Sequence, residues 1–317
     1  MLCRRVLSSL FVMSLVSGCA STSGAESSGE GPTASESATA RTPTPFHVAR
    51  SGKGRPVVFI PGLASSGDVW RETVAHLGGQ YDIHVLTLAG FAGQPAVSAP
   101  FFETQRRAVA AYLHEQGLEN PILVGHSLGG VLALAVAADV PERVGGVVVV
   151  DSLPFLPAAM YPGATVESSR PYADQMRTQM RTQPVAQRNE VLRQTLRRYI
   201  TDEAQQDIAF GWGTRSDTET VAQAMYELMT TDLRPELPRI TAPTLVLGSW
   251  IALKGQVPRE TIEAVYKGQY AALTSARVVM HDTARHFLMW DDPQGFFREL
   301  DGFLGAHAPM AQVEPRP

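Results

Sequence analysis

The chain has 317 residues, of which 44% are hydrophobic and 18% are charged, and its formal net charge is −4. This composition is typical of a globular protein with a sizeable core, and the absence of any basic block argues against a nucleic-acid-binding protein. Both cysteines, Cys3 and Cys19, lie near the N-terminus, so the rest of the chain can form neither an internal disulfide nor a site of cysteine-bound zinc.

The N-terminus has the pattern of an export signal. Two arginines at positions 4 and 5 precede an apolar stretch at 6–16, which is too short to span a bilayer. The next residues, Val16-Ser17-Gly18-Cys19, resemble the lipobox of bacterial lipoproteins, in which the peptide is cut before a cysteine that receives a diacylglycerol. We therefore expect a signal peptide at 1–18 and a lipid anchor on Cys19; the alternative is an ordinary cleaved leader with an incidental cysteine.

Residues 19–45 follow the expected cleavage point and are rich in Ser, Thr, Ala, Gly and Glu, with no apolar period. This composition predicts a flexible linker between the lipidated cysteine and the folded part. The expected location is the membrane surface of the bacterial cell envelope. Ala20 stands where an Asp would retain a Gram-negative lipoprotein in the inner membrane, so the resemblance favours the outer membrane for such a source.

Residues 46–308 are predicted to form one domain in which apolar strands alternate with helices. The expected strands are short runs rich in β-branched residues, at 57–60, 83–88, 121–125, 146–150, 244–248 and 276–280. Helical spacing occurs at 102–116 and 127–139. Continuous apolar runs are typical of strands that are covered on both faces, so the pattern predicts an α/β fold with a mostly parallel sheet.

The segment from about 154 to 238 has no strand pattern and contains polar helical stretches at 187–199 and 218–230. Helices inserted between two strands, here after the strand that ends at Asp151, predict a cap over the strand ends. Some apolar cap residues are candidates for an acyl pocket, although most are expected to pack the cap on the core: Phe155, Met160, Tyr161, Tyr172, Met176, Met180, Phe210, Trp212, Met225, Tyr226 and Met229. The cap arginines are expected on a solvated face, with attraction of anionic substrates or a lipid surface as the alternative: Arg170, Arg177, Arg181, Arg188, Arg193, Arg197 and Arg198.

Ser127 is the candidate nucleophile, because it lies in the sequence Gly125-His126-Ser127-Leu128-Gly129 between an apolar strand and an apolar helix. A serine on such a sharp turn needs small neighbours two residues before and after it. At the start of a helix its hydroxyl is also near partial positive charge, which favours a developing oxyanion. The alternative is a serine that merely caps the helix.

These motifs resemble those of the α/β-hydrolase superfamily over residues 46–306. The matching segments, in order, are Phe59-Ile60-Pro61-Gly62-Leu63, Gly125-His126-Ser127-Leu128-Gly129-Gly130, Val140-Pro141-Glu142-Arg143-Val144, and Ala284-Arg285-His286-Phe287. The resemblance implies an oxyanion hole made by the backbone N–H groups of Leu63 and Leu128. Many relatives have His-Gly where this chain has Pro61-Gly62, a difference that we expect to affect support of the loop more than the chemistry.

His286 is the candidate base. It follows a predicted strand and a short loop, and it comes well after the serine, which is the chain order of this fold. An imidazole can accept the serine proton and return it to the leaving group. A structural loop histidine is the alternative. His281 is a weaker candidate because it is expected still to lie in the strand, and His126 is expected to pack against or orient the nucleophile turn.

The acid is less clear, since most members of the superfamily carry it after the penultimate strand, and residues 248–256 contain neither Asp nor Glu. Asp151, at the end of the strand at 146–150, is the best substitute. The resemblance allows it, because some members of the superfamily carry their acid after this strand, and carboxyl ends of parallel strands meet at one edge of the sheet. It could instead merely cap a loop. The other possibilities are Asp282, Asp291 or Asp292, or a dyad in which a water or Ser249 lies behind the histidine.

Together these residues predict a serine hydrolase that cleaves carboxylic esters of small molecules through an acyl-enzyme on Ser127, without a metal or cofactor. Thioester, amide, C–C bond and peracid chemistry are rivals within the same fold. A second kind of function is a lipoprotein whose hydrolase fold has lost catalysis and binds a ligand or partner, which the missing acid would favour.

Overall fold

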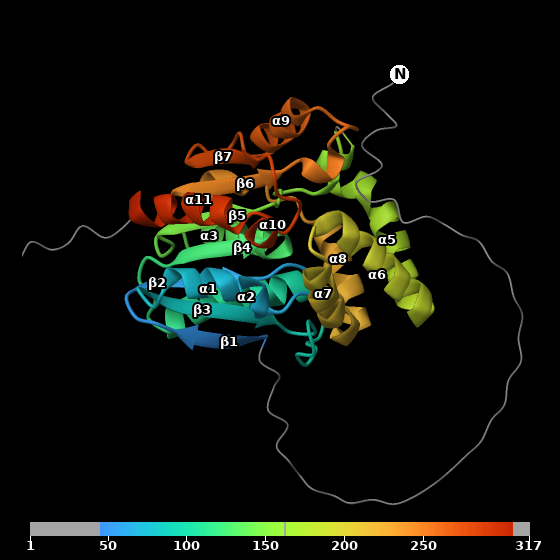
Figure 1. The fold of residues 1–317 in the computed structure, drawn as a ribbon, viewed down its shortest axis with the longest axis horizontal. Coiled ribbons are helices and arrows are strands. Elements are labelled where there is room, and N and C mark those ends of the chain that lie inside the picture. Colours follow the sequence, from blue (N-terminus) through green and yellow to red (C-terminus); the bar gives the residue numbers. More distant parts are fainter. Residues whose placement is uncertain (1–44, 162, 307–317) are drawn as a thin grey trace, which may run out of the picture.

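The computed structural model describes residues 45–161 and 163–306, which fold around a seven-stranded sheet (Figure 1). The strand order is β1-β3-β2-β4-β5-β6-β7, and each neighbouring pair is parallel except β1 with β3. The strands are β1 (Phe46–Ser51), β2 (Arg55–Ile60), β3 (Tyr81–Leu88), β4 (Ile122–His126), β5 (Gly146–Val150), β6 (Thr244–Ser249) and β7 (Ala276–His281). The predicted mostly parallel sheet is confirmed; the antiparallel edge strand β1 was not predicted.

Helices cover both faces of this sheet, as the continuous apolar strands require. On one face α1 (Arg71–Leu77) and α11 (Pro293–Ala306) pack on the core, and on the other α2 (Phe101–Glu115), α3 (Leu128–Asp139) and α9 (Arg259–Gln269) do so. Residues 128–138 of helix α3 are all buried, which explains why this helix has no polar face. Short helical turns complete the connections: η2 (Gly67–Trp70), η3 (Leu237–Arg239), η4 (Ile251–Leu253) and α10 (Leu288–Asp291).

A helical cap separates β5 from β6 and lies beyond the carboxyl ends of the parallel strands (Figure 1). It consists of α4 (Pro157–Met160), α5 (Val166–Thr182), α6 (Val185–Tyr199), α7 (Glu203–Arg215) and α8 (Thr218–Thr230). Thr165, Asp202 and Asp217 cap α5, α7 and α8 by accepting a hydrogen bond from a backbone N–H in the first turn. The predicted cap after the strand preceding Asp151 is thereby confirmed.

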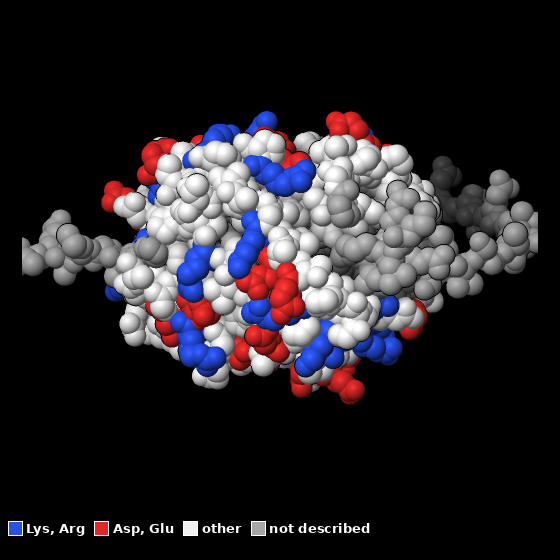
Figure 2. Space-filling view, turned by 90° about the horizontal axis from the view of Figure 1, so that it is seen from above, with Lys and Arg blue, Asp and Glu red and all other residues white. Residues whose placement is uncertain are grey.

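The predicted signal peptide, the lipidation site at Cys19 and the linker up to Thr44 lie outside the described residues. Within the two described ranges, no helix is long and apolar enough to cross a membrane. Lys and Arg side chains are interspersed with Asp and Glu on the face that Figure 2 presents.

Candidate active site

Ser127 lies on a sharp bend between β4 and α3. Its φ of 52° and ψ of −119° are outside the backbone regions that residues other than glycine ordinarily adopt. Holding a residue in such a conformation costs about 1–3 kcal/mol of folding free energy. The bend is fixed by its backbone N–H, which donates a 2.9 Å hydrogen bond to the carbonyl of Val150 at the end of β5. Strain of this kind persists only where the surrounding structure imposes it.

The flanking glycines are required by close approach of the backbone. A Cβ on Gly125 would overlap the carbonyl of Gly129, and a Cβ on Gly129 would overlap the carbonyl of Ile60 in β2. The strand and the helix can therefore meet at Ser127 only when both positions lack a side chain. This packing is the physical reason for the glycine spacing in the sequence.

Asp151 lies directly after β5 and also has a positive φ, of 45°. One carboxylate oxygen, Oδ2, is 2.6 Å from Nδ1 of His286. Since a carboxylate only accepts, this Nδ1 carries the proton and donates it, which leaves Nε2 of His286 with a free lone pair. Nε2 can then accept a proton from a serine hydroxyl.

The second carboxylate oxygen of Asp151, Oδ1, is held by two donors. The backbone N–H of Ser249 donates at 2.8 Å, and the Tyr266 hydroxyl from α9 donates at 2.6 Å. Burial raises the pKa of Tyr266 well above its ordinary value, so this hydroxyl stays protonated and continues to donate. Asp151 is therefore fixed at both oxygens.

The His286 ring lies between aromatic neighbours. The rings of His126 and Tyr199 each have their centroid 4.6 Å from that of His286. His126 Nε2 donates a 3.0 Å hydrogen bond to the backbone carbonyl of His286, and burial lowers the pKa of His126 well below its ordinary value, which keeps that ring neutral. His126 was expected to pack against or orient the nucleophile turn; its hydrogen bond instead joins that turn to the His286 loop, a contact that was not predicted.

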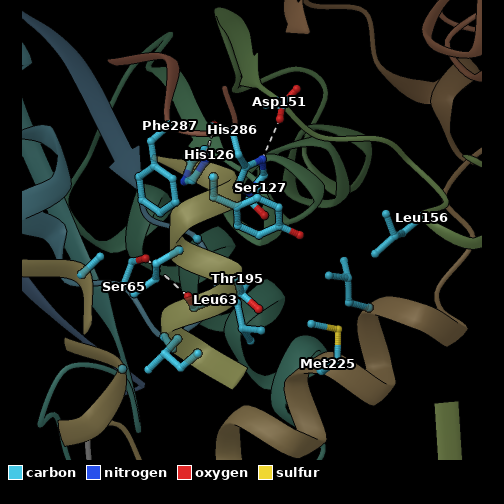
Figure 3. A pocket seen from close by; sticks show the side chains of 18 of the residues that line it. Leu63, Ser65, His126, Ser127, Asp151, Leu156, Thr195, Met225, His286 and Phe287 are labelled. Atoms are coloured by element: carbon cyan, nitrogen blue, oxygen red, sulfur yellow. Dashed lines mark hydrogen bonds and ion pairs between the residues drawn. The ribbon is translucent and has the colours of Figure 1, made fainter. Parts of the chain in front are cut away.

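Ser127, Asp151 and His286 line one cavity, and Figure 3 shows the three together at one end of it. The elements that bring them there are far apart in sequence: the end of β4, the end of β5 and the loop after β7. A serine, an imidazole and a carboxylate placed together in this way are the groups that acyl transfer by a serine enzyme uses.

The two predicted oxyanion donors lie beside Ser127. Leu128 is the first residue of α3, so its N–H has no partner within the helix. Leu63 belongs to the loop after β2, in which the Ser65 N–H donates to the Gly62 carbonyl. The Ser65 hydroxyl also donates to the Leu63 carbonyl (Figure 3). Among the described residues, no acceptor is found for the N–H of Leu63. Both groups are therefore free to bind an oxyanion.

The other candidate acids form hydrogen bonds with groups other than the His286 ring. Asp282 is exposed and accepts from Trp250 and Arg259; Asp291 accepts from Thr201 and the Arg285 N–H; Asp292 accepts from Thr283 and the Gly295 N–H. The Ser249 hydroxyl donates to the carbonyl of Ala284, 2.6 Å away, and not to His286. Of the candidates weighed from the sequence, only Asp151 contacts the His286 ring.

The cavity has a volume of about 450 Å³ and extends from Ser127 under the cap. Leu63 and Ser65 lie on one side of it, and Leu156 and Met225 lie on the other, with Thr195 between them (Figure 3). Of the cap residues proposed for an acyl pocket, four methionines line it: Met160, Met176, Met180 and Met225. The other seven do not line it. Tyr161 is exposed, and six are buried or half-buried, in agreement with the expectation that most pack the cap on the core: Phe155, Tyr172, Phe210, Trp212, Tyr226 and Met229.

Sequence reasoning missed Tyr266 and the backbone N–H of Ser249. Tyr266 has no sequence signal, since a tyrosine on an amphipathic helix is ordinary. Ser249, however, ends the penultimate strand, where the superfamily usually carries its acid, and its N–H instead donates to Asp151. Across the described ranges, His, Cys, Asp and Glu form no group of three or more that could hold a metal ion.

Comparison with known proteins agrees with this architecture. The model of the Alpha/beta hydrolase family matches residues 57–299. The chain is 32% identical to a pimeloyl-[acyl-carrier protein] methyl ester esterase of Edwardsiella ictaluri over 69% of this chain and 83% of that protein. It is 26% identical to an N-formylmaleamate deformylase of Pseudomonas putida over 80% of this chain and 90% of that protein. An esterase from Exiguobacterium antarcticum has the same fold, with a TM-score of 0.68 and 19% identity over 82% of this chain and 95% of that one.

Proposed function

Because the chain belongs to the alpha/beta hydrolase family, we propose that it hydrolyses carboxylic esters of small molecules through an acyl-enzyme on Ser127. The observation that carries the proposal is the 2.6 Å contact between Asp151 Oδ2 and His286 Nδ1 beside a serine on a strained bend. It supports a complete triad in place of the acid-less dyad that the sequence left open.

The proposed reaction begins when the Ser127 hydroxyl attacks the ester carbonyl carbon and gives its proton to Nε2 of His286. Asp151 stabilises the resulting imidazolium through Nδ1, and the N–H groups of Leu63 and Leu128 bind the oxyanion. The tetrahedral intermediate expels the alcohol, which takes the proton from His286. Water, activated by the same histidine, then attacks the acyl-enzyme, and the carboxylic acid leaves with Ser127 restored.

We propose esters as substrates, rather than other acyl compounds, because the relative with the higher identity is named for methyl ester cleavage. The deformylase among the relatives acts on a formyl amide, so amide cleavage is the nearest rival chemistry. The mostly apolar cavity, of about 450 Å³, fits a small or medium-sized substrate and supports a free ester over a large polymer.

Hydrolysis of a panel of p-nitrophenyl esters by the domain without residues 1–45 tests the proposal. We expect turnover by the unaltered domain and a loss of at least about 10³-fold in kcat in Ser127→Ala. Turnover that is the same in Ser127→Ala would reject the mechanism. Absence of turnover with every ester would favour the rival function, in which the fold binds a ligand without catalysis.

The same proposal includes the position of the enzyme in the cell. The lipobox-like segment ending at Cys19 supports attachment to a membrane of the bacterial cell envelope by a lipid, with the linker separating the hydrolase from the bilayer. Fractionation of cells that express the full chain tests it. Cys19→Ser should move the protein from the membrane to the soluble fraction, and retention in the membrane would exclude this anchor.

A further inference from the structure

Helix α6 lines the active-site cavity along its whole length. The residues that contact the cavity lie three and four positions apart, on one face of the helix: Val185, Arg188, Asn189, Val191, Leu192, Thr195, Leu196 and Tyr199. The helix begins at Val185 and ends at Tyr199, whose ring lies 4.6 Å from that of His286. One end of α6 is therefore at the candidate triad, and the other end lies at the margin of the cavity, where Val185 is exposed.

The length of α6 gives the distance between Arg188 and Tyr199. Arg188 precedes Tyr199 by eleven residues, which corresponds to about 16 Å along the helix axis. Between them, the cavity wall is apolar where Leu192 and Leu196 line it, together with Met225 from α8. A hydrocarbon chain of about ten carbons, with C–C bonds of about 1.5 Å, would cover most of this distance, and the arginine side chain would cover the rest.

Arg188 differs from the other basic residues of the cap. Among the described residues that line the cavity it is the only Lys or Arg, and its side chain is half-buried. Within the described ranges, its guanidinium has neither a carboxylate nor a ring as partner. In contrast, three neighbouring cap arginines form ion pairs: Arg177 with Asp174, Arg181 with Glu219, and Arg193 with Asp207.

A half-buried cation without a partner next to an apolar wall loses hydration and gains no hydrogen bond in return. An anionic ligand group would supply the missing partner through charge-assisted hydrogen bonds. The cavity thus has a nucleophile at one end, a hydrocarbon-lined middle and a positive charge at the other end.

We infer that Arg188 binds an anionic group at the far end of the substrate, so that preferred substrates are esters with a carboxylate about ten carbons from the scissile bond. The inference rests on the proposed ester hydrolysis at Ser127 and adds to it the substrate class. A charge-assisted hydrogen bond at this position is worth about 1.5–3 kcal/mol, which corresponds to a roughly 10- to 100-fold preference in kcat/KM.

Two pairs of esters measure the preference and show which side of the ester faces Arg188. The first pair is the monomethyl ester of dodecanedioic acid and the methyl ester of ω-hydroxydodecanoic acid, which differ in the charge at the far end of the acyl chain. The second pair is the acetate ester of ω-hydroxydodecanoic acid and the monoacetate of dodecanediol, which differ in the charge at the far end of the alcohol. We expect at least about 10-fold higher kcat/KM for the charged member of one pair, mainly through KM.

Arg188→Gln should abolish this preference and leave hydrolysis of p-nitrophenyl acetate unchanged, since acetate does not reach position 188. Arg188→Glu should reverse it in favour of an ester with a terminal ammonium group. Arg197→Gln is the matched control, because Arg197 is on the same helix but is exposed and does not line the cavity. This control should keep the preference of the unaltered enzyme.

Equal kcat/KM within both pairs, or a preference that survives in Arg188→Gln, would overturn the inference and leave the proposed esterase intact. If the unaltered enzyme did not hydrolyse p-nitrophenyl acetate at all, both proposals would be overturned. The two failures are therefore distinguished by the short ester, which depends on Ser127 and not on Arg188.

Discussion

The Tyr266 hydroxyl donates a 2.6 Å hydrogen bond to Asp151 Oδ1, the carboxylate oxygen that does not contact His286. Tyr266 comes from α9, which follows β6, whereas Asp151 follows β5. A helix near the C-terminus therefore holds the candidate acid in place from the side opposite the imidazole. We therefore expect Tyr266 to position Asp151, a role that the motifs do not reveal.

Tyr266→Phe removes this donor and leaves the Ser249 N–H as the other donor to Asp151 Oδ1. Since a hydrogen bond to a charged group is worth about 1.5–3 kcal/mol, we expect kcat to fall about 10-fold or more with KM little changed. Tyr270→Phe is the matched control, because Tyr270 is also buried on this segment but donates to the Ser152 carbonyl. Equal kcat in Tyr266→Phe and the unaltered enzyme would show that the contact is only structural.

Asp151→Asn keeps the shape of the acid but removes its charge, so that the imidazole tautomer is no longer fixed. We expect a loss of at least about 10³-fold in kcat, measured with a p-nitrophenyl ester. Asp282→Asn should have little effect, because Asp282 pairs with Arg259 at the surface and not with His286. Near-normal kcat in Asp151→Asn would refute the assignment of Asp151.

Gly129→Ala tests the packing at the nucleophile bend. The added methyl group would overlap the carbonyls of Ile60 and Pro61, so we expect the free energy of unfolding to fall by about 3 kcal/mol or more. Gly302→Ala in α11 is the control, since no atom lies within 4 Å of the added carbon, and it should raise stability by up to about 1 kcal/mol. Denaturant unfolding measures both; a stable Gly129→Ala would mean that the bend is not closely packed.

His126 makes stability depend on pH. Its pKa is lowered by burial in the folded state, so below pH of about 6.5 the unfolded chain binds a proton that the folded protein does not. The stability that a neutral His126 allows is therefore present above this pH and declines as the pH falls. Each pH unit in this window removes about 1.4 kcal/mol per histidine.

His126→Gln cannot titrate, and its amide can still donate to the His286 carbonyl. The slope of unfolding free energy against pH, measured by urea unfolding between about pH 6 and 5, should fall by about 1.4 kcal/mol per pH unit relative to the unaltered protein. His47→Gln, at an exposed position on β1, is measured alongside as the comparison. An unchanged slope in His126→Gln would show that burial of this ring does not control acid stability.

The sequence predicts the elements whose patterns are local. The apolar run at 146–150 and the glycines around Ser127 predict a buried strand and a tight bend, and both are present. Strand β1 was missed because it is an edge strand with mostly exposed side chains, so it lacks the continuous apolar run of its neighbours. Its pairing with β3 is a tertiary contact that no local pattern encodes.

Some residues of the candidate site could be predicted from local motifs, and others could not. Ser127, His286 and the backbone donors lie in recognisable motifs. Asp151 has no motif, and it was chosen because some members of the superfamily carry their acid after this strand and because strand ends meet at one edge of a sheet. Tyr266 and Arg188 are different, since their positions depend on how α9 and α6 pack beside the cavity. A single tyrosine or arginine on an amphipathic helix carries no signal of such a role.

The central claim is that Ser127 is a nucleophile activated by the Asp151–His286 pair. Its most direct test is mass spectrometry of the protein after reaction with a fluorophosphonate, followed by mapping of the labelled peptide. We expect one label per chain on the peptide that contains Ser127, formed much more slowly in Asp151→Asn and His286→Ala. A chain that gains no label, or gains it elsewhere while ester turnover persists in Ser127→Ala, would contradict the claim.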